Sequence, residues 1–196
     1  NTFDLRQAWI EFRQSEKNGW AFRVGRQELN YGDQRLVGAL NWTNTTRTFD
    51  AAKLSYTNDQ LNVDAFASSV VVIQDNVFDK HFDGANFYGL YANFFKAIPK
   101  AQLDAYTFWK TNPLVLDEKA RLGDADTWTF GSRLAGKAGS RVDYGIEAVG
   151  QSGTFSTTDI RAAAFHGRMM VGLWKDARYP RPRVEYNYAS GDADPT

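Results

Sequence analysis

Apolar and polar residues alternate along the chain in long runs, and the connections between these runs are alternately tight and long. The tight polar connections fall near residues 16–19, 58–60, 97–99, 138–140 and 176–179. The longer loops are centred near Asp33, Asp79, Asp117 and Thr154. A period of two gives each run one face that suits an apolar environment and one that suits water. The pattern therefore predicts about ten strands in a meander of antiparallel β-hairpins.

The alternation is easiest to follow between residues 60 and 69. Leu61, Val63 and Ala65 share a face there, Asp64 lies on the opposite face, and Phe66 is an exception. The same alternation recurs at residues 86–96, 103–110, 128–134, 142–148, 160–171 and 183–188. Runs of this length with one apolar face are typical of strands that cross a bilayer.

Two other β architectures have to be weighed. A soluble β-sandwich also alternates, but its strands average about five or six residues. A propeller blade needs four short strands per repeat, whereas each repeat of about forty residues here holds two long ones. Large outward aromatic residues near the predicted strand ends favour a membrane barrel with an interfacial girdle: Trp20, Tyr56, Phe94, Trp109 and Trp128.

Composition excludes several classes of protein. The 23 basic and 23 acidic residues give a pI near 6.9, which offers no reason to expect nucleic acid as a partner. The chain contains no cysteine, so thiolate metal sites and disulfides are excluded. No run of about eighteen apolar residues predicts a transmembrane helix, but a spanning strand needs only about nine to eleven residues.

The predicted fold class is all-β, an antiparallel up-and-down transmembrane β-barrel. About ten strands do not close well around so many large polar inward residues. We therefore expect residues 1–196 to form a single β-barrel domain that is part of a larger barrel. Outer-membrane lipid would surround that larger barrel. Because an open sheet edge cannot face lipid, we expect further strands to complete the wall in the working protein.

Three segments resemble one known family. They are "LRQAWIEF" at residues 5–12, "FRVGRQELNYGDQRLVGALNW" with "RTFDAAKLSY" after it, and "YPRPRVEYNYASGD" near the end. Together they resemble the alginate-export family of bacterial outer-membrane barrels, in its N-terminal to middle part. The resemblance implies a monomeric barrel of roughly eighteen strands in a Gram-negative outer membrane, and it leaves room for a periplasmic export partner. Arg6 matches a basic constriction residue of the exporters, while Gln7 stands where they carry an acid.

The polar face supplies the candidate pore-lining residues. Its cations are Arg23, Lys53, Lys110, Arg133 and Arg183, and its carboxylates are Glu11, Asp64, Asp104, Asp143, Glu147 and Glu185. Arg6, Arg26 and Arg35 are added because they lie in the family-like segments. Alternation places Arg26 with Phe22 and Val24, so Arg26 requires either a bulge near Gly25 or a position beyond the bilayer. Charges of this kind either select ions or only brace a polar interior.

The resulting hypothesis is an outer-membrane channel of the alginate-export type. It would pass anionic saccharides or small anionic solutes by passive diffusion through a charged lumen. The alternative is a non-transporting barrel that acts as a surface scaffold or adhesin through its loops. We expect no enzyme, because no motif brings a nucleophile next to a base.

No cofactor or metal site is expected either. The pairs Asp124 with Asp126 and Asp192 with Asp194 fit solvated loop turns better than calcium sites. The only histidines are His81, expected in a loop, and His166, expected in a strand. A metal site or proton relay built from this pair is therefore not expected.

Overall fold

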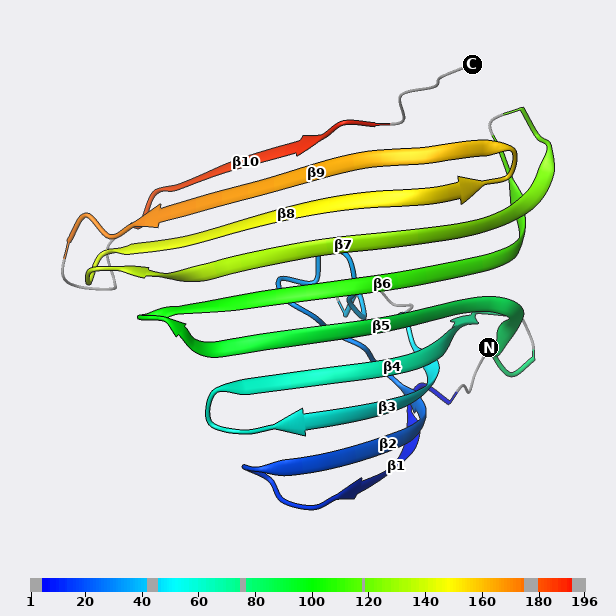
Figure 1. Cartoon of the computed structure of the whole chain (residues 1–196), viewed down its shortest axis with the longest axis horizontal. Helices are drawn as coiled ribbons and strands as arrows, with labels where there is room; N and C mark the ends of the chain where they lie inside the picture. The colour runs from blue at the N-terminus through cyan, green and yellow to red at the C-terminus, as the bar shows by residue number, and fades with distance from the viewer. Residues whose placement is uncertain (1–4, 42–45, 75–76, 118, 175–179, 192–196) are drawn as a thin grey trace.

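The structure is a computed structural model that describes residues 5–41, 46–74, 77–117, 119–174 and 180–191. Its ten strands follow one another in chain order and form one antiparallel sheet (Figure 1). They are β1 (Ala8–Arg13), β2 (Gly19–Gln27), β3 (Phe49–Thr57), β4 (Leu61–Val72), β5 (Lys80–Ile98), β6 (Ala101–Leu116), β7 (Leu122–Ala138), β8 (Val142–Phe155), β9 (Thr158–Val171) and β10 (Arg183–Ala189). The predicted up-and-down meander is confirmed.

The sheet is open: β1 and β10 lie at its two edges, and each strand pairs with its sequence neighbours. The chain thus supplies a continuous wall of a barrel without closing it. Among the described residues, no helix is long and apolar enough to cross a membrane.

The two faces of the sheet differ in chemistry. On the face that we call outer, apolar residues such as Leu54, Leu90 and Phe130 are exposed. On the face that we call inner, Asp104 and Arg133 are buried against other protein groups. The alternation in the sequence predicted this division, and Phe66, its exception, is a buried residue of the inner face. An exposed apolar outer face is what a lipid-facing wall requires.

The outer apolar band ends at a row of polar residues. The register pairs Asp50 with Ser69, Ser69 with Asn86, Asn86 with Thr111 and Thr111 with Asp126, all on the outer face. Directly below this row, Trp109 stacks on Trp128 with ring centroids 5.3 Å apart and on Tyr88 at 4.9 Å. The indole Nε1 of Trp109 donates to Asp126 at 2.8 Å. An aromatic side chain with an apolar ring and a hydrogen-bonded polar edge suits the boundary between lipid and water.

The strand boundaries on the loop side differ from the prediction. Thr154 lies within β8, and β8 and β9 are joined by Ser156 and Thr157 alone, so no long loop exists there. The connection at residues 117–121 is also short. Trp109 and Trp128 consequently lie well inside β6 and β7 rather than near their ends. Polar residues continued the strands because their backbone groups still find partners in the ladder.

The tight connections at residues 14–18, 58–60, 99–100 and 139–141 agree with the sequence. The turn predicted at residues 176–179 lies outside the described residues. The four tight connections at residues 14–18, 58–60, 99–100 and 139–141 share one end of the sheet, which we call the turn end.

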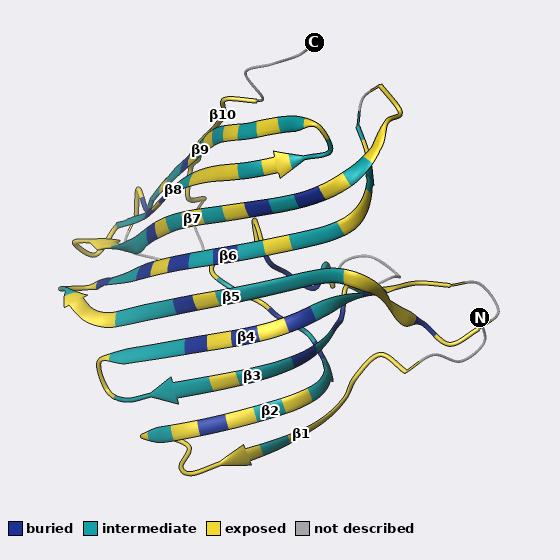
Figure 2. Ribbon diagram, turned by 45° about the vertical axis from the view of Figure 1, so that its right-hand side comes forward, coloured by how far each residue is buried: buried dark blue, intermediate teal, exposed yellow. Residues whose placement is uncertain are grey.

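Residues 28–48, between β2 and β3, form what we call the inner loop, of which residues 42–45 are not described. Leu29 and Val37 of this loop are buried in a cluster with Phe66 of β4 and Tyr91 of β5. The loop is seen in Figure 1 behind β5, β6 and β7, and Figure 2 shows the buried positions gathered in the middle of β4 to β7. The chain therefore builds its core between the inner face and a loop folded against it.

Candidate functional site

The inner loop reaches across the wall at Asp33. Its carboxylate accepts a hydrogen bond from Arg133 of β7 at 2.5 Å and lies 3.1 Å from Arg168 of β9. The neighbouring Gly32 has φ +56°, and a Cβ there would lie 3.0 Å from the hydroxyl of Tyr91. Glycine therefore permits both the left-handed backbone and the close approach of the loop to the wall.

Arg133 joins this loop to a fully buried carboxylate. Its Nη1 donates to Asp104 of β6 at 3.0 Å, and Asp104 has no exposed surface. Asp104 also accepts hydrogen bonds from the Tyr91 hydroxyl at 2.9 Å and from the side-chain amides of Asn93 and Gln102 at 2.8 and 2.7 Å. The donors around this carboxylate fix its position, and the carboxylate in turn fixes the position of the Arg133 guanidinium.

An aromatic layer lies beside the charged network. Tyr31 of the inner loop stacks on Tyr91 with centroids 4.6 Å apart and on Phe66 at 5.6 Å. Its hydroxyl donates to Asp64 at 3.1 Å, and Lys53 lies 3.5 Å from the same carboxylate. Burial, together with the charge of Asp64, raises the pKa of Tyr31, so the hydroxyl remains a proton donor.

A second contact ties the loop to the last strand. Arg35 donates to Glu185 of β10 at 2.6 Å and to Asn187 at 3.2 Å. Glu185 also pairs with Arg183. Asp33 thus ties the inner loop to β7 and β9, and Arg35 ties it to β10.

The remaining predicted inner-face residues occupy separate positions. Arg23 pairs with Glu11 at 2.6 Å, and its guanidinium carbon lies 4.0 Å from the ring centre of Trp9. Glu147 accepts a hydrogen bond from Tyr106 at 2.7 Å. Asp143 pairs with Arg181 and lies 3.8 Å from Lys137; Lys110 is exposed beside Phe108 and Val37; Arg183 lies near the turn end.

Arg6 and Arg26 lie apart from this set. Arg6 precedes β1 and donates to Glu28 and Asn41, which belong to the inner loop. Arg26 pairs with Asp50 at 2.8 Å in an unbroken register between β2 and β3. Without a bulge, Arg26 is on the outer face, in line with the polar row. The second option from the sequence, a position beyond the bilayer, therefore fits.

Several residues of the network were not among the sequence candidates. Asp33 was missed because alternation does not predict which way a loop residue faces. Arg168 was missed because only the extent of the run at residues 160–171 was predicted and not the face on which each of its residues lies. Tyr91 and Tyr106 donate to buried carboxylates, although they look like ordinary aromatic residues of a strand. The sequence did contain one indication, because alternation places Tyr91 on the face opposite to Leu90 and Ala92.

Two expectations about isolated polar residues were wrong. His81 lies in β5 rather than in a loop, and it pairs with Asp50 at 3.2 Å. Asp124 and Asp126 lie in β7 rather than in a loop turn. Asp192 and Asp194 are outside the described residues. Within the described part of the chain, no group of three or more histidine or acidic side chains is placed to hold a metal ion.

One antiparallel up-and-down sheet, with an apolar outer face and charges gathered on the inner face, is the wall of a transmembrane β-barrel. The family model described as Alginate export matches residues 1–196. The chain belongs to this family, which is one of outer-membrane transport proteins rather than enzymes. A comparison with curated proteins gave no match.

Proposed function

We propose that the chain forms part of an outer-membrane channel that passes anionic saccharides or small anionic solutes by passive diffusion. The observation that carries the proposal is the inner loop, which contains Arg35 and lies over a wall containing Arg133 and Arg168. Cationic side chains favour anions in a constricted pore, and carboxylates beside them keep each contact weak enough for release. The channel would function as a monomer in the lipid of a Gram-negative outer membrane.

The inner loop supports a constriction at mid-wall. It brings Asp33 to Arg133 and Arg35 to Glu185, so that loop and wall together limit the free width. The charges within it belong to two groups. Those that are buried, such as Asp104 and Arg133, brace the loop, whereas exposed ones such as Lys110 remain able to meet a solute.

The experiment is a reversal-potential measurement. The intact protein is reconstituted in a planar bilayer with a salt gradient, and we expect a potential of the sign that anion preference produces. A Lys110→Glu variant should shift this potential toward cation preference, and Lys17→Glu, in the turn between β1 and β2, serves as the control. Cation preference or an absence of conductance would contradict the proposal.

The tight packing of the inner loop also favours a second candidate, a non-transporting barrel that acts as a surface scaffold or adhesin. That candidate requires a closed lumen, and it predicts no conductance in the same bilayers. Deletion of residues 73–79, which connect β4 and β5, should then abolish surface binding without changing permeability. Surface binding that survives this deletion would contradict the scaffold candidate.

A further inference from the structure

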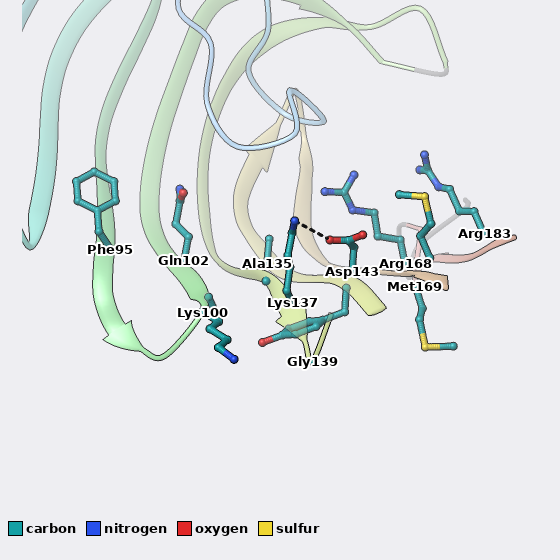
Figure 3. Close-up of a pocket in the computed structure, with 14 residues that line it drawn as sticks. Phe95, Lys100, Gln102, Ala135, Lys137, Gly139, Asp143, Arg168, Met169 and Arg183 are labelled. Carbon is teal, nitrogen blue, oxygen red and sulfur yellow. Dashed lines mark ion pairs between the residues drawn. The ribbon is translucent and has the colours of Figure 1, made fainter. Parts of the chain in front are cut away.

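The inner face is hollowed at the turn end. A pocket of about 680 Å³ is lined by the ends of β5 to β10 (Figure 3). Four cationic side chains line it, Lys100, Lys137, Arg168 and Arg183, against one carboxylate, Asp143. Arg168 is already paired with Asp33 and Arg183 with Glu185, so the charge that remains for a ligand is that of Lys100 and Lys137.

The two lysines of this pocket are less compensated than the arginines at mid-wall. Lys137 has a side chain that is 72% exposed, and it lies 3.8 Å from Asp143, which Arg181 already engages. Lys100 has no carboxylate partner among the described residues, and it is exposed at the turn between β5 and β6. Hydrated ammonium groups on flexible stems can attract an anion without binding it rigidly.

The pocket also presents an aromatic surface. The ladder between β5 and β6 is interrupted between Phe94 and Ile98, and Phe95 falls within this irregularity. Its side chain is 43% exposed and lines the pocket. Bulges commonly redirect a side chain at a sheet end. A few polar groups around an apolar contact surface are typical of small-molecule sites.

We propose that this pocket is a docking site for the carboxylated sugar units of an anionic saccharide before they reach the inner loop. The carboxylates would lie against Lys100 and Lys137, and the apolar face of a sugar ring would pack on Phe95. Gln102 also lines the pocket, and its side-chain amide nitrogen donates to Asp104 at 2.7 Å. The proposal rests on the proposed channel function, and it places a separate binding step at the turn end of the channel.

The test is calorimetric titration of the intact protein in detergent with trigalacturonate, and with maltotriose as the neutral probe. We expect trigalacturonate to bind and maltotriose to bind at least tenfold more weakly. The double variant Lys100→Gln/Lys137→Gln should lose about tenfold in affinity for trigalacturonate. Lys17→Gln, an exposed lysine in another turn at the same end, should bind as the unaltered protein does.

A second variant tests the contact with the Phe95 ring separately from the charges of the two lysines. Phe95→Ala should weaken binding of trigalacturonate several-fold while the reversal potential in chloride is unchanged. Equal affinity of the unaltered protein and the double variant, or equal affinity for both saccharides, overturns the docking site. If anion preference in the bilayer persists in that case, the docking site fails and the channel function stands. If conductance is absent while binding follows the expected order, the channel function fails and the docking site stands.

Discussion

Asp33 Oδ1 lies 2.5 Å from Arg133 Nη2, although the two residues are 100 positions apart in the chain. The contact joins the inner loop, which lies between β2 and β3, to β7. Asp104 of β6 accepts a hydrogen bond from the same guanidinium at 3.0 Å. Arg133 is therefore held by a carboxylate of the wall as well as by one of the loop. The loop supplies one carboxylate to complete its surroundings.

Asp33→Asn should weaken the attachment of the inner loop by about 1–3 kcal/mol, because a charge-assisted hydrogen bond is replaced by a neutral one. The chain has no cysteine, so Leu36→Cys introduces a single label site on the loop. Maleimide labelling of Leu36→Cys should be faster with Asp33→Asn than without it. Asp59→Asn, in the turn before β4, is the control and should leave the labelling rate unchanged.

Tyr31→Ala should release the inner loop more strongly than Asp33→Asn does. The ring of Tyr31 stacks on Tyr91 and Phe66, and removal of a buried aromatic side chain costs about 3–5 kcal/mol. We expect a larger single-channel conductance in planar bilayers. Tyr31→Phe keeps the stacking and loses only the hydrogen bond to Asp64, so its conductance should stay near that of the unaltered protein. A rise as large in Tyr31→Phe would assign the effect to the hydroxyl instead.

Gly131→Ala should lower the free energy of unfolding by about 1–3 kcal/mol. A Cβ at Gly131 would lie 2.3 Å from the ring of Tyr106, so the ring would have to leave its hydrogen bond with Glu147. Urea unfolding of protein refolded into vesicles measures the change. Gly150→Ala in β8 is the matched control, since a Cβ there meets nothing within 4 Å. Equal losses in both variants would exclude the ring contact as the cause.

The connection at residues 117–121 should loosen in acid. The backbone N–H of Arg121, 2.8 Å from Asp117, and the Arg121 guanidinium at 2.6 Å hold the pKa of this carboxyl below its usual value. A lowered folded-state pKa means that the stabilisation is present above the unfolded pKa and is lost as pH falls through the folded one. The protection factor of the Arg121 amide, which compares its exchange rate with the intrinsic rate at the same pH, should fall over that range. In Asp117→Asn the protection factor should not fall in this way.

The sequence predicted the strands and the facing of their residues because a period of two leaves little freedom to a wall with one apolar face. Leu61, Val63 and Ala65 are on the outer face and Asp64 on the inner, as expected. Phe66 broke the pattern because it packs under a loop rather than against water. Alternation could not reveal that loop, since its contacts, such as Arg35 with Glu185, join residues far apart in the chain.

The loop at Thr154 was predicted wrongly for a different reason. Gln151, Ser152 and Thr154 are polar, and a polar segment without apolar alternation resembles a loop. Here the strands continue past the apolar band, where water on both faces makes polar residues acceptable. Polarity therefore marked the boundary of the bilayer and not the boundary of the sheet.

In the proposed channel with its turn end in the periplasm, the two-residue turn between β8 and β9 would have a consequence for what the cell surface presents. Up to Phe155 and Thr158 the backbone is engaged in ladder hydrogen bonds, so this part of the rim offers a protease no slack segment to draw into its cleft. It would present an antibody with a stiff ridge whose shape is the same in every copy. Recognition from outside the cell would then depend on side chains such as Thr157, and very little on backbone adjustment.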